Sequence, residues 1–161
     1  IVFDHYEELA NFWETEVITR KSRDGLIDML DALRQRGIRM GIISNTGSFT
    51  QVHTSLEQYG IRSYFEVIIL SSNLGIRKPH PFLFHEALRK MHSDAARAMY
   101  IGDTVSRDVI GAKVAGLYKS VQIKSEFTKL NDDTSTDQPR PDYVIHTLLD
   151  IPPIIDDINS K

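Results

Sequence analysis

The sequence has no cysteine, no long apolar run and no large excess of charge of either sign. Without cysteine, it can form no disulfide, no thiolate nucleophile and no cysteine metal site. Its apolar runs fall short of the roughly 20 residues that cross a bilayer, and no signal-peptide pattern opens the chain. We therefore expect a cytoplasmic protein with no membrane partner. A net charge of −3 gives no electrostatic reason to expect nucleic acid either.

The length and composition describe a soluble globular protein. The chain has 161 residues, of which 41% are hydrophobic and 25% are charged, which suits one well-buried domain better than two. The first residue is Ile1 rather than Met. We therefore expect that the natural beginning of the chain is missing.

Segments of helical and strand pattern alternate along the chain. An amphipathic helix is expected over residues 6–17, with Leu9, Ala10, Trp13 and Val17 recurring at helical spacing and acidic residues on the other face. After it, strands are expected over 38–43, 67–70, 98–101, 117–123 and 143–145, and helices over 26–37, 52–60, 81–91, 109–116 and 148–155. This alternation predicts an α/β domain with a mainly parallel sheet, in which ligands bind at the carboxyl ends of the strands.

Two segments break the regular pattern. Residues 124–141 are polar, with a run of Asp, Ser and Thr and two prolines, and we expect a mobile loop there. Pro152 and Pro153 should interrupt the last helix.

Two carboxylates follow the strand that ends at Gly102. Asp103 and Asp108 would repel each other unless a cation lay between them, and oxygen ligands favour a hard ion such as Mg²⁺. The alternative is purely structural, with one Asp capping the following helix and the other stabilised by the helix dipole.

Polar side chains also follow the two preceding strands. Ser44 and Asn45 end the first strand, in a loop whose backbone N–H groups can face one point, and Lys78 follows the second strand. The ends of parallel strands share one edge of the sheet, so these groups can converge with Asp103 and Asp108. Such a set suits a phosphoryl group, because hydroxyl and N–H groups hold its oxygens while Lys78 and Mg²⁺ neutralise its charge.

At this point the chain resembles the haloacid dehalogenase superfamily of phosphohydrolases, from about Asp24 to the C-terminus. Residues 42–46 (IISNT) resemble its second motif, 78–81 (KPHP) its third, and 102–108 (GDTVSRD) its fourth. The resemblance implies a Rossmann-like three-layer sandwich over residues 21–161. It also implies that residues 1–20 are the remnant of a helical cap.

The resemblance further implies roles for individual residues. Ser44 would hydrogen-bond the phosphoryl group, with the Asn45 amide beside it, and Lys78 would stabilise the charge of the nucleophile and the phosphoryl group. Asp103 and Asp108 would hold Mg²⁺, Asp103 more directly. The implied activity is hydrolysis of a small phosphorylated metabolite through an aspartyl-phosphate intermediate.

The sequence departs from the superfamily pattern at the first motif. That motif requires a strand that ends in an aspartate nucleophile, followed two positions later by a second Asp. Asp4 follows three apolar residues, but Tyr6 stands where the second acid should be. We expect that the nucleophile lies upstream of Ile1, that Asp4 caps the first helix, and that this chain alone is inactive. Because the missing strand is central in the superfamily, we also expect unpaired inner edges on strands 39–43 and 98–101.

Three other classes of protein share some of these features. A receiver domain would have its acids first and its Lys-Pro last, which is the reverse of the order here. A dinucleotide-binding domain would need a Gly-x-Gly-x-x-Gly turn, which the sequence lacks. A non-catalytic phosphate-binding or scaffold protein of the same fold remains the alternative. The six histidines show no metal-ligand spacing, although His80 lies inside the third motif.

Overall fold

The structure is a computed structural model that describes residues 5–17, 21–124 and 139–160. Asp4 and most of the predicted loop at 124–141 lie outside these residues. The strands are β1 (Met40–Ser44), β2 (Phe65–Leu70), β3 (Met99–Gly102), β4 (Lys119–Ile123) and β5 (Tyr143–Ile145). The α-helices are α1 (Tyr6–Phe12), α2 (Leu26–Gln35), α3 (Gln51–Gln58), α4 (Ser71–Leu74), α5 (Phe82–Lys90), α6 (Ile110–Val114) and α7 (Ile151–Asn159), and π-helical turns occupy Trp13–Val17 and Val105–Val109.

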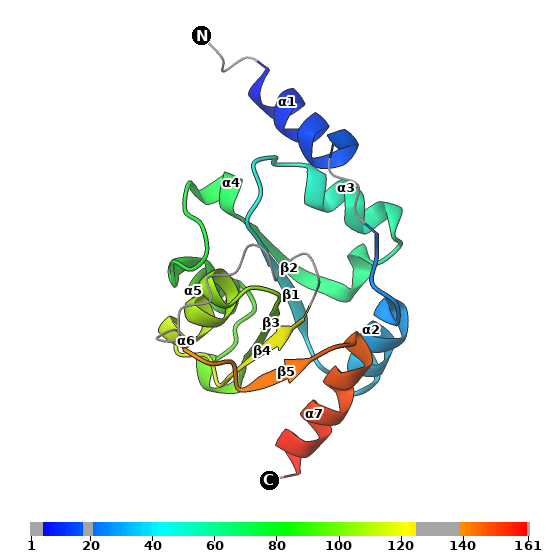
Figure 1. Cartoon of the computed structure of the whole chain (residues 1–161), viewed down its shortest axis with the longest axis vertical. Helices are drawn as coiled ribbons and strands as arrows, with labels where there is room; N and C mark the ends of the chain where they lie inside the picture. Colours follow the sequence, from blue (N-terminus) through cyan, green and yellow to red (C-terminus); the bar gives the residue numbers. More distant parts are fainter. Residues whose placement is uncertain (1–4, 18–20, 125–138, 161) are drawn as a thin grey trace.

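The strands lie between two groups of helices (Figure 1). Every strand pairing among the described residues is parallel, between β1 and β2, β3 and β4, and β4 and β5. Helices α2, α3 and α7 lie on one side of the strands, and α5 and α6 on the other. This confirms the predicted α/β class with parallel strands. No helix in the described part is long and apolar enough to span a membrane.

Strand alternation divides the core between these two sides. Successive residues of a strand point to opposite faces. Thus Ile42 and Ile101 pack with the buried residues of α2, α3 and α7, whereas Ile43 and Tyr100 pack against Phe84 of α5 and its neighbours. The strands are therefore covered on both faces, which explains their near-continuous apolar sequence.

The strands form two sheets rather than one. Among the described residues, β1 pairs only with β2, and β3 pairs only with β4. The inner edges of β1 and β3 therefore have no ladder partner within the described part, as expected. A side chain connects the two strands at this point, because the Tyr100 hydroxyl lies 3.3 Å from the carbonyl oxygen of Ile43.

Two details differ from the sequence prediction. Residues 71–74, expected as loop, form the short helix α4, which ends at Gly75 in the left-handed conformation. Helix α7 runs without interruption through Pro152 and Pro153, because both prolines lie in its first turn, where no N–H donor is needed.

The N-terminal segment forms an arm, defined here as Tyr6–Val17, that projects from the body of the molecule (Figure 1). The predicted helix is present, but no residue of α1 is buried. Trp13, one of the apolar residues at helical spacing, is 59% exposed. The side of the arm that faces the core is mostly polar, so the orientation expected from its apolar spacing is wrong.

Candidate functional site

The centre of the site is a buried ion pair between Lys78 of the third predicted motif and Asp108 of the fourth. The Lys78 ammonium lies 2.8 Å from Asp108 Oδ1, and the two side chains are only 12% and 6% exposed. Burial alone would raise the pKa of Asp108, but the charge and hydrogen bond of Lys78, with hydrogen bonds from Thr104, hold this pKa below its usual value. Asp108 is therefore an anion at neutral pH.

Thr104 and Gly102 fix the other side of the Asp108 carboxylate. Oδ2 accepts hydrogen bonds from the Thr104 backbone N–H at 3.0 Å and from the Thr104 hydroxyl at 2.8 Å. A methyl group at Gly102 would lie 2.4 Å from the Asp108 side chain. The spacing Gly102, Thr104, Asp108 therefore has a physical reason, since glycine leaves room for the carboxylate to fold back beneath the strand end.

Asn45 positions the backbone of Lys78 from the neighbouring strand. Its Nδ2 donates to the Lys78 carbonyl at 3.1 Å, and its Oδ1 accepts from the Lys78 N–H at 2.8 Å. These two bonds connect the end of β1 to the loop that carries the ammonium. The peptide bond between Lys78 and Pro79 is cis.

Asp103 lies at the end of β3, half-buried and close enough to Asp108 to feel its charge. Burial raises the pKa of Asp103, and the negative charge of Asp108 raises it further, while Arg107 and Arg23 lower it to a smaller extent. The net result is a pKa above the usual value for an aspartate. The charged form of Asp103 is thus disfavoured by burial and by its negative neighbour, and an added cation beside it would favour that charged form.

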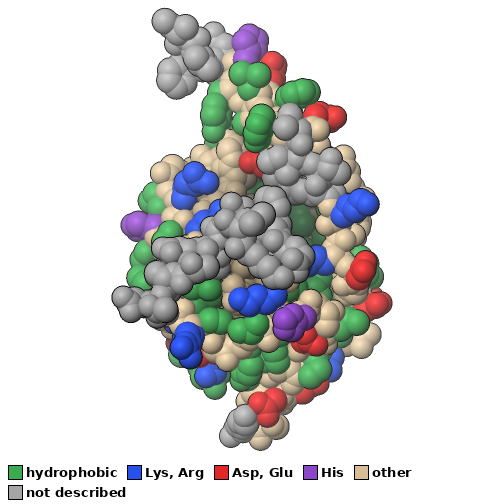
Figure 2. Space-filling view, viewed as in Figure 1, with side chains coloured by type: hydrophobic (Ala, Val, Ile, Leu, Met, Phe, Trp, Pro, Cys, Tyr) green, Lys and Arg blue, Asp and Glu red, His purple; other side chains and the backbone are tan. Residues whose placement is uncertain are grey.

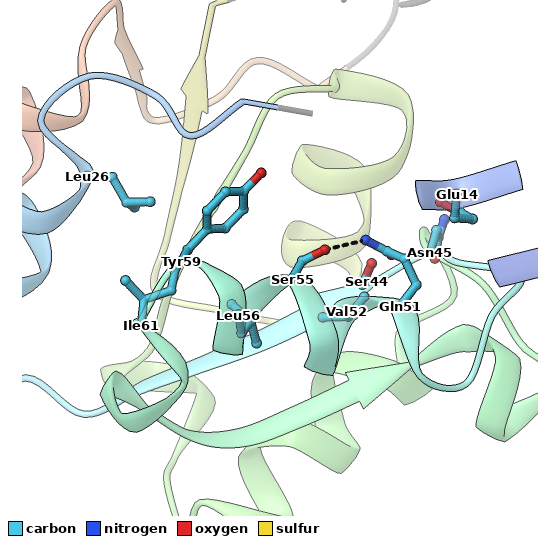
Figure 3. Close-up of a pocket in the computed structure, with 10 residues that line it drawn as sticks. All are labelled: Glu14, Leu26, Ser44, Asn45, Gln51, Val52, Ser55, Leu56, Tyr59 and Ile61. Atoms are coloured by element: carbon cyan, nitrogen blue, oxygen red, sulfur yellow. Dashed lines mark hydrogen bonds between the residues drawn. The ribbon is translucent and has the colours of Figure 1, made fainter. Parts of the chain in front are cut away.

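Ser44 opens onto a cavity of about 280 Å³ on the α3 side of β1 (Figure 3). The Ser44 end of this cavity is polar, with Asn45 and the Gln51–Ser55 pair, whose side chains are joined by a hydrogen bond of 2.9 Å. The other end is mostly apolar. The residues that line the cavity are Glu14, Leu26, Ser44, Asn45, Gln51, Val52, Ser55, Leu56, Tyr59 and Ile61.

The loop between β1 and α3 does not present its backbone N–H groups openly, contrary to the simplest reading of its sequence. Glu7 of the arm accepts hydrogen bonds from the backbone N–H groups of Phe49 and Thr50, and Glu14 accepts one from Gly47. The two carboxylates of the arm thus occupy donors that could otherwise serve a bound anion. The cause is the acidic face of the arm, which meets the loop.

A metal site built from three or more acidic or histidine side chains is absent from the described residues. The two aspartates at the end of β3 are the oxygen donors that the structure offers for a hard cation. The oxygens of Asp108 already accept hydrogen bonds from Lys78 and Thr104. Asp103 is therefore the more accessible of the two as a ligand.

The family model described as haloacid dehalogenase-like hydrolase matches residues 3–123. The chain belongs to this family. The match spans all three predicted motifs, and it agrees with the parallel strands and with the order of polar residues at their ends.

Individual members of the family extend the similarity. The chain is 28% identical to the glyceraldehyde 3-phosphate phosphatase of Methanopyrus kandleri over 87% of this chain and 60% of the relative. It is 35% identical to the pyrimidine 5'-nucleotidase YjjG of Escherichia coli over 58% of this chain and 41% of that enzyme. A crystal structure of a HAD phosphatase from Thermococcus onnurineus superimposes with a TM-score of 0.72, at 27% identity, covering 93% of this chain and 64% of that one. The chain thus spans about half of the length of these relatives.

Within this haloacid dehalogenase-like chain, the structure brings together four of the five predicted site residues by direct contact or charge: Asn45, Lys78, Asp103 and Asp108. Ser44 lies at the end of the same strand as Asn45 and lines the adjoining cavity. The roles of all five remain predictions. Sequence reasoning missed Tyr100 and Glu7. In the sequence, Tyr100 is one residue of an apolar strand and Glu7 is one residue of a polar helix face. Neither pattern indicates a contact with the site.

Proposed function

We propose that this chain is part of a Mg²⁺-dependent phosphohydrolase that acts on a small phosphorylated metabolite through an aspartyl-phosphate intermediate. The observation that carries the proposal is the buried pair of Lys78 and Asp108, with Asp103 beside it at the shared edge of the strands. An ammonium group beside two carboxylates, at the carboxyl ends of parallel strands, suits a phosphoryl group and a divalent metal. Family membership and the phosphatase activity for which the relatives are named support the same conclusion.

The residues would divide the work by their chemistry. The Ser44 hydroxyl donates to a phosphoryl oxygen, and the Lys78 ammonium neutralises part of the phosphoryl charge. Asn45 holds the Lys78 backbone in place by its two hydrogen bonds. Asp108 holds the Lys78 ammonium in place through their ion pair at 2.8 Å.

Asp103, supported by Asp108, would hold the Mg²⁺ ion. Burial and the neighbouring negative charge raise the pKa of Asp103. A bound divalent cation would offset both effects, because it stabilises the charged carboxylate. When bound, Mg²⁺ neutralises charge on a phosphoryl oxygen and helps to orient the group for in-line attack.

The nucleophile would be a carboxylate on a strand that lies between β1 and β3. Within the described part, β1 and β3 have no ladder partner at their inner edges, and the Tyr100 hydroxyl reaches from one strand to the other; both observations support this. A carboxylate at the end of such a strand would lie beside Ser44, Lys78 and Asp103. Asp4 lies outside the described residues.

The size of the cavity beside Ser44 supports a small substrate. Its volume of about 280 Å³ is just below the range of roughly 300–1,000 Å³ that is typical of ligand pockets. The polar end would adjoin the phosphoryl group, and Val52 and Leu56 at the other end would contact the organic part. Relatives named for glyceraldehyde 3-phosphate and for pyrimidine nucleotides also act on small phosphorylated molecules.

Binding measurements test the metal and phosphate parts of the proposal. In calorimetry, Asp103→Asn should weaken Mg²⁺ binding at least about tenfold, because one of few charged ligands is lost. The control is Asp28→Asn, which removes an exposed carboxylate from α2. Equal Mg²⁺ affinity of Asp103→Asn and Asp28→Asn would remove Asp103 as the ligand.

A turnover assay tests the nucleophile. With Mg²⁺ and a generic aryl phosphate, this chain by itself should show no appreciable turnover, since losing a nucleophile typically costs several orders of magnitude in rate. Turnover that the Asp4→Asn variant abolishes would identify Asp4 as the nucleophile and refute a strand from elsewhere. Phosphate binding without turnover, even when the missing strand is supplied as part of a longer chain, would favour the non-catalytic alternative.

A further inference from the structure

Tyr100 lies at the junction of three parts of the site. Its side chain comes from β3, its hydroxyl oxygen lies 2.9 Å from the Lys78 ammonium, and the same oxygen lies 3.3 Å from the Ile43 carbonyl of β1. We propose that Tyr100 is a positioning residue that holds the Lys78 ammonium toward the phosphoryl site. The proposal rests on the function proposed above, in that Lys78 is the group that meets the phosphate.

The direction of each hydrogen bond follows from the chemistry of the donors. An ammonium group can only donate, so the tyrosine oxygen accepts from Lys78. The hydroxyl proton is then left to donate to the carbonyl of Ile43. Burial and the nearby negative charges of Asp108 and Asp103 raise the pKa of Tyr100 well above 10, so the hydroxyl keeps its proton at neutral pH. Neither bond can reverse.

These contacts use two of the three N–H donors of the ammonium. Asp108 Oδ1 takes one at 2.8 Å and Tyr100 takes the second at 2.9 Å. Among the described residues no third acceptor contacts the ammonium, so one donor is left for a phosphoryl oxygen. With Asp108 alone, the ammonium could rotate about a single contact. The second contact therefore sets the direction of the remaining donor, which is what positioning requires.

The ring of Tyr100 is itself held firmly. It meets the ring of Phe84 edge to face, with centroids 4.9 Å apart and planes 70° apart. Phe84 is almost fully buried and belongs to the same cluster as Ala112. The hydroxyl therefore projects from a fixed ring rather than from a mobile side chain, and its position is set by packing.

The variant Tyr100→Phe removes the hydroxyl and keeps the ring contact with Phe84. The matched control is Tyr64→Phe, which removes a hydroxyl bonded to Asp31 on the α2 side of the molecule, away from Lys78. Both variants of the full chain should remain folded by circular dichroism. The comparison thus separates the loss of this particular hydroxyl from the general cost of losing one.

The first readout follows the Lys78 ammonium directly, in metal-free protein labelled with ¹⁵N-lysine. An ammonium held by two hydrogen bonds exchanges its protons slowly enough to give an NMR signal, which the Lys78→Arg variant assigns by its disappearance. We expect this signal in the unaltered chain and in Tyr64→Phe, and its loss in Tyr100→Phe. Its absence from the unaltered chain, or its persistence unchanged in Tyr100→Phe, would overturn the proposal.

The second readout is the affinity for inorganic phosphate in the presence of Mg²⁺. Tyr100→Phe should weaken it about tenfold, the size of one hydrogen bond to a charged group, and Tyr64→Phe should leave it unchanged. Equal affinities of the two variants would mean that Tyr100 only packs against its neighbours. If the unaltered chain bound no phosphate, the proposed function would fail, but the ammonium signal would still decide whether Tyr100 holds Lys78.

Discussion

The ion-pair site and the N-terminal arm show opposite relations between polarity and burial. At the site, Lys78 and Asp108 are charged side chains buried under the ends of the strands, and they are paired at 2.8 Å. In the arm, the half-buried stripe that faces the core includes Glu7, Asn11 and Glu14, whereas a group of large apolar side chains is exposed. Figure 2 shows apolar side chains on the surface of this projecting segment.

The difference concerns what holds each region in place. The site is surrounded by a packed core, so each polar group there needs a partner. The arm is attached by Glu7 and Glu14 to the loop after β1, and by the Tyr6 hydroxyl to the Gly47 carbonyl at 2.8 Å. Asn11 Oδ1 is buried without a hydrogen-bond partner among the described residues. Loss of a polar contact should therefore destabilise the fold at the site but only release the arm.

The largest expected effect comes from Lys78→Met, which leaves the Asp108 carboxylate buried without its cation. We expect a loss of about 3 kcal/mol in the free energy of unfolding, measured by urea titration with circular dichroism. The control is Lys113→Met, which breaks a more exposed pair with Asp142 and should cost less than about 1 kcal/mol. Similar losses of unfolding free energy in the two variants would show that burial does not make the Lys78–Asp108 pair more important for stability than an exposed pair.

The next largest effect is expected from Gly102→Ala. The added methyl group would lie 2.4 Å from Asp108, so the carboxylate or the strand must move, at a cost of about 2 kcal/mol. Gly47→Ala, in the loop beneath the arm, is the matched control, because its methyl group would meet the nearest atom only at 3.6 Å. Thermal unfolding of the two variants should differ clearly. A stable Gly102→Ala protein would mean that the strand end is adaptable.

A smaller effect on stability, but a large one on mobility, is expected from Glu7→Ala. It removes the acceptor of four hydrogen bonds from Ser48, Phe49 and Thr50. Trp13, the one tryptophan in the sequence, lies in the arm, so its fluorescence anisotropy reports the arm alone. We expect lower anisotropy with less than about 1 kcal/mol of global destabilisation. Glu8→Ala, which removes a carboxylate paired with the exposed His5, should leave the anisotropy unchanged.

The smallest effect is the response of the arm to acid. Burial by itself would raise the pKa of Glu7, but hydrogen bonds from Phe49, Ser48 and Thr50 outweigh burial and lower this pKa from 4.5. A lowered pKa means that the attachment is fully present above pH 4.5 and is lost as the pH falls through the lowered value. Trp13 anisotropy should therefore stay constant down to about pH 4.5 and fall below it. A fall centred above that pH would assign the attachment to another group.

The fold and the positions of the site residues were predictable because both follow from local patterns. Alternating strands and helices indicated the parallel arrangement, and the carboxyl ends of such strands meet at one edge. Asp108 could be placed next to Lys78 on that basis. The way Thr104 and Gly102 hold the Asp108 carboxylate could not be predicted, because it depends on how the chain turns just after the end of β3.

Contacts between segments that are distant in the sequence could not be predicted from local patterns. The spacing of Leu9 and Trp13 indicated an amphipathic helix, but spacing does not say which face meets the core. Here Glu7 and Glu14 meet backbone N–H groups, and that interaction decided the orientation. Similarly, nothing in an apolar strand reveals that one hydroxyl, that of Tyr100, reaches a lysine from another loop. The predicted cap assignment of residues 1–20 and the predicted compartment remain predictions.

The separation of β1 from β3 also bears on how the chain behaves at high concentration. Within the described part, the inner edges of both strands present backbone groups without ladder partners. Such edges are templates for strand addition, which is how soluble proteins begin to aggregate. A strand from another copy of the chain could pair with these edges in place of the strand proposed to lie between them. Self-association should therefore increase with protein concentration and decrease when an extended segment fills the space between β1 and β3.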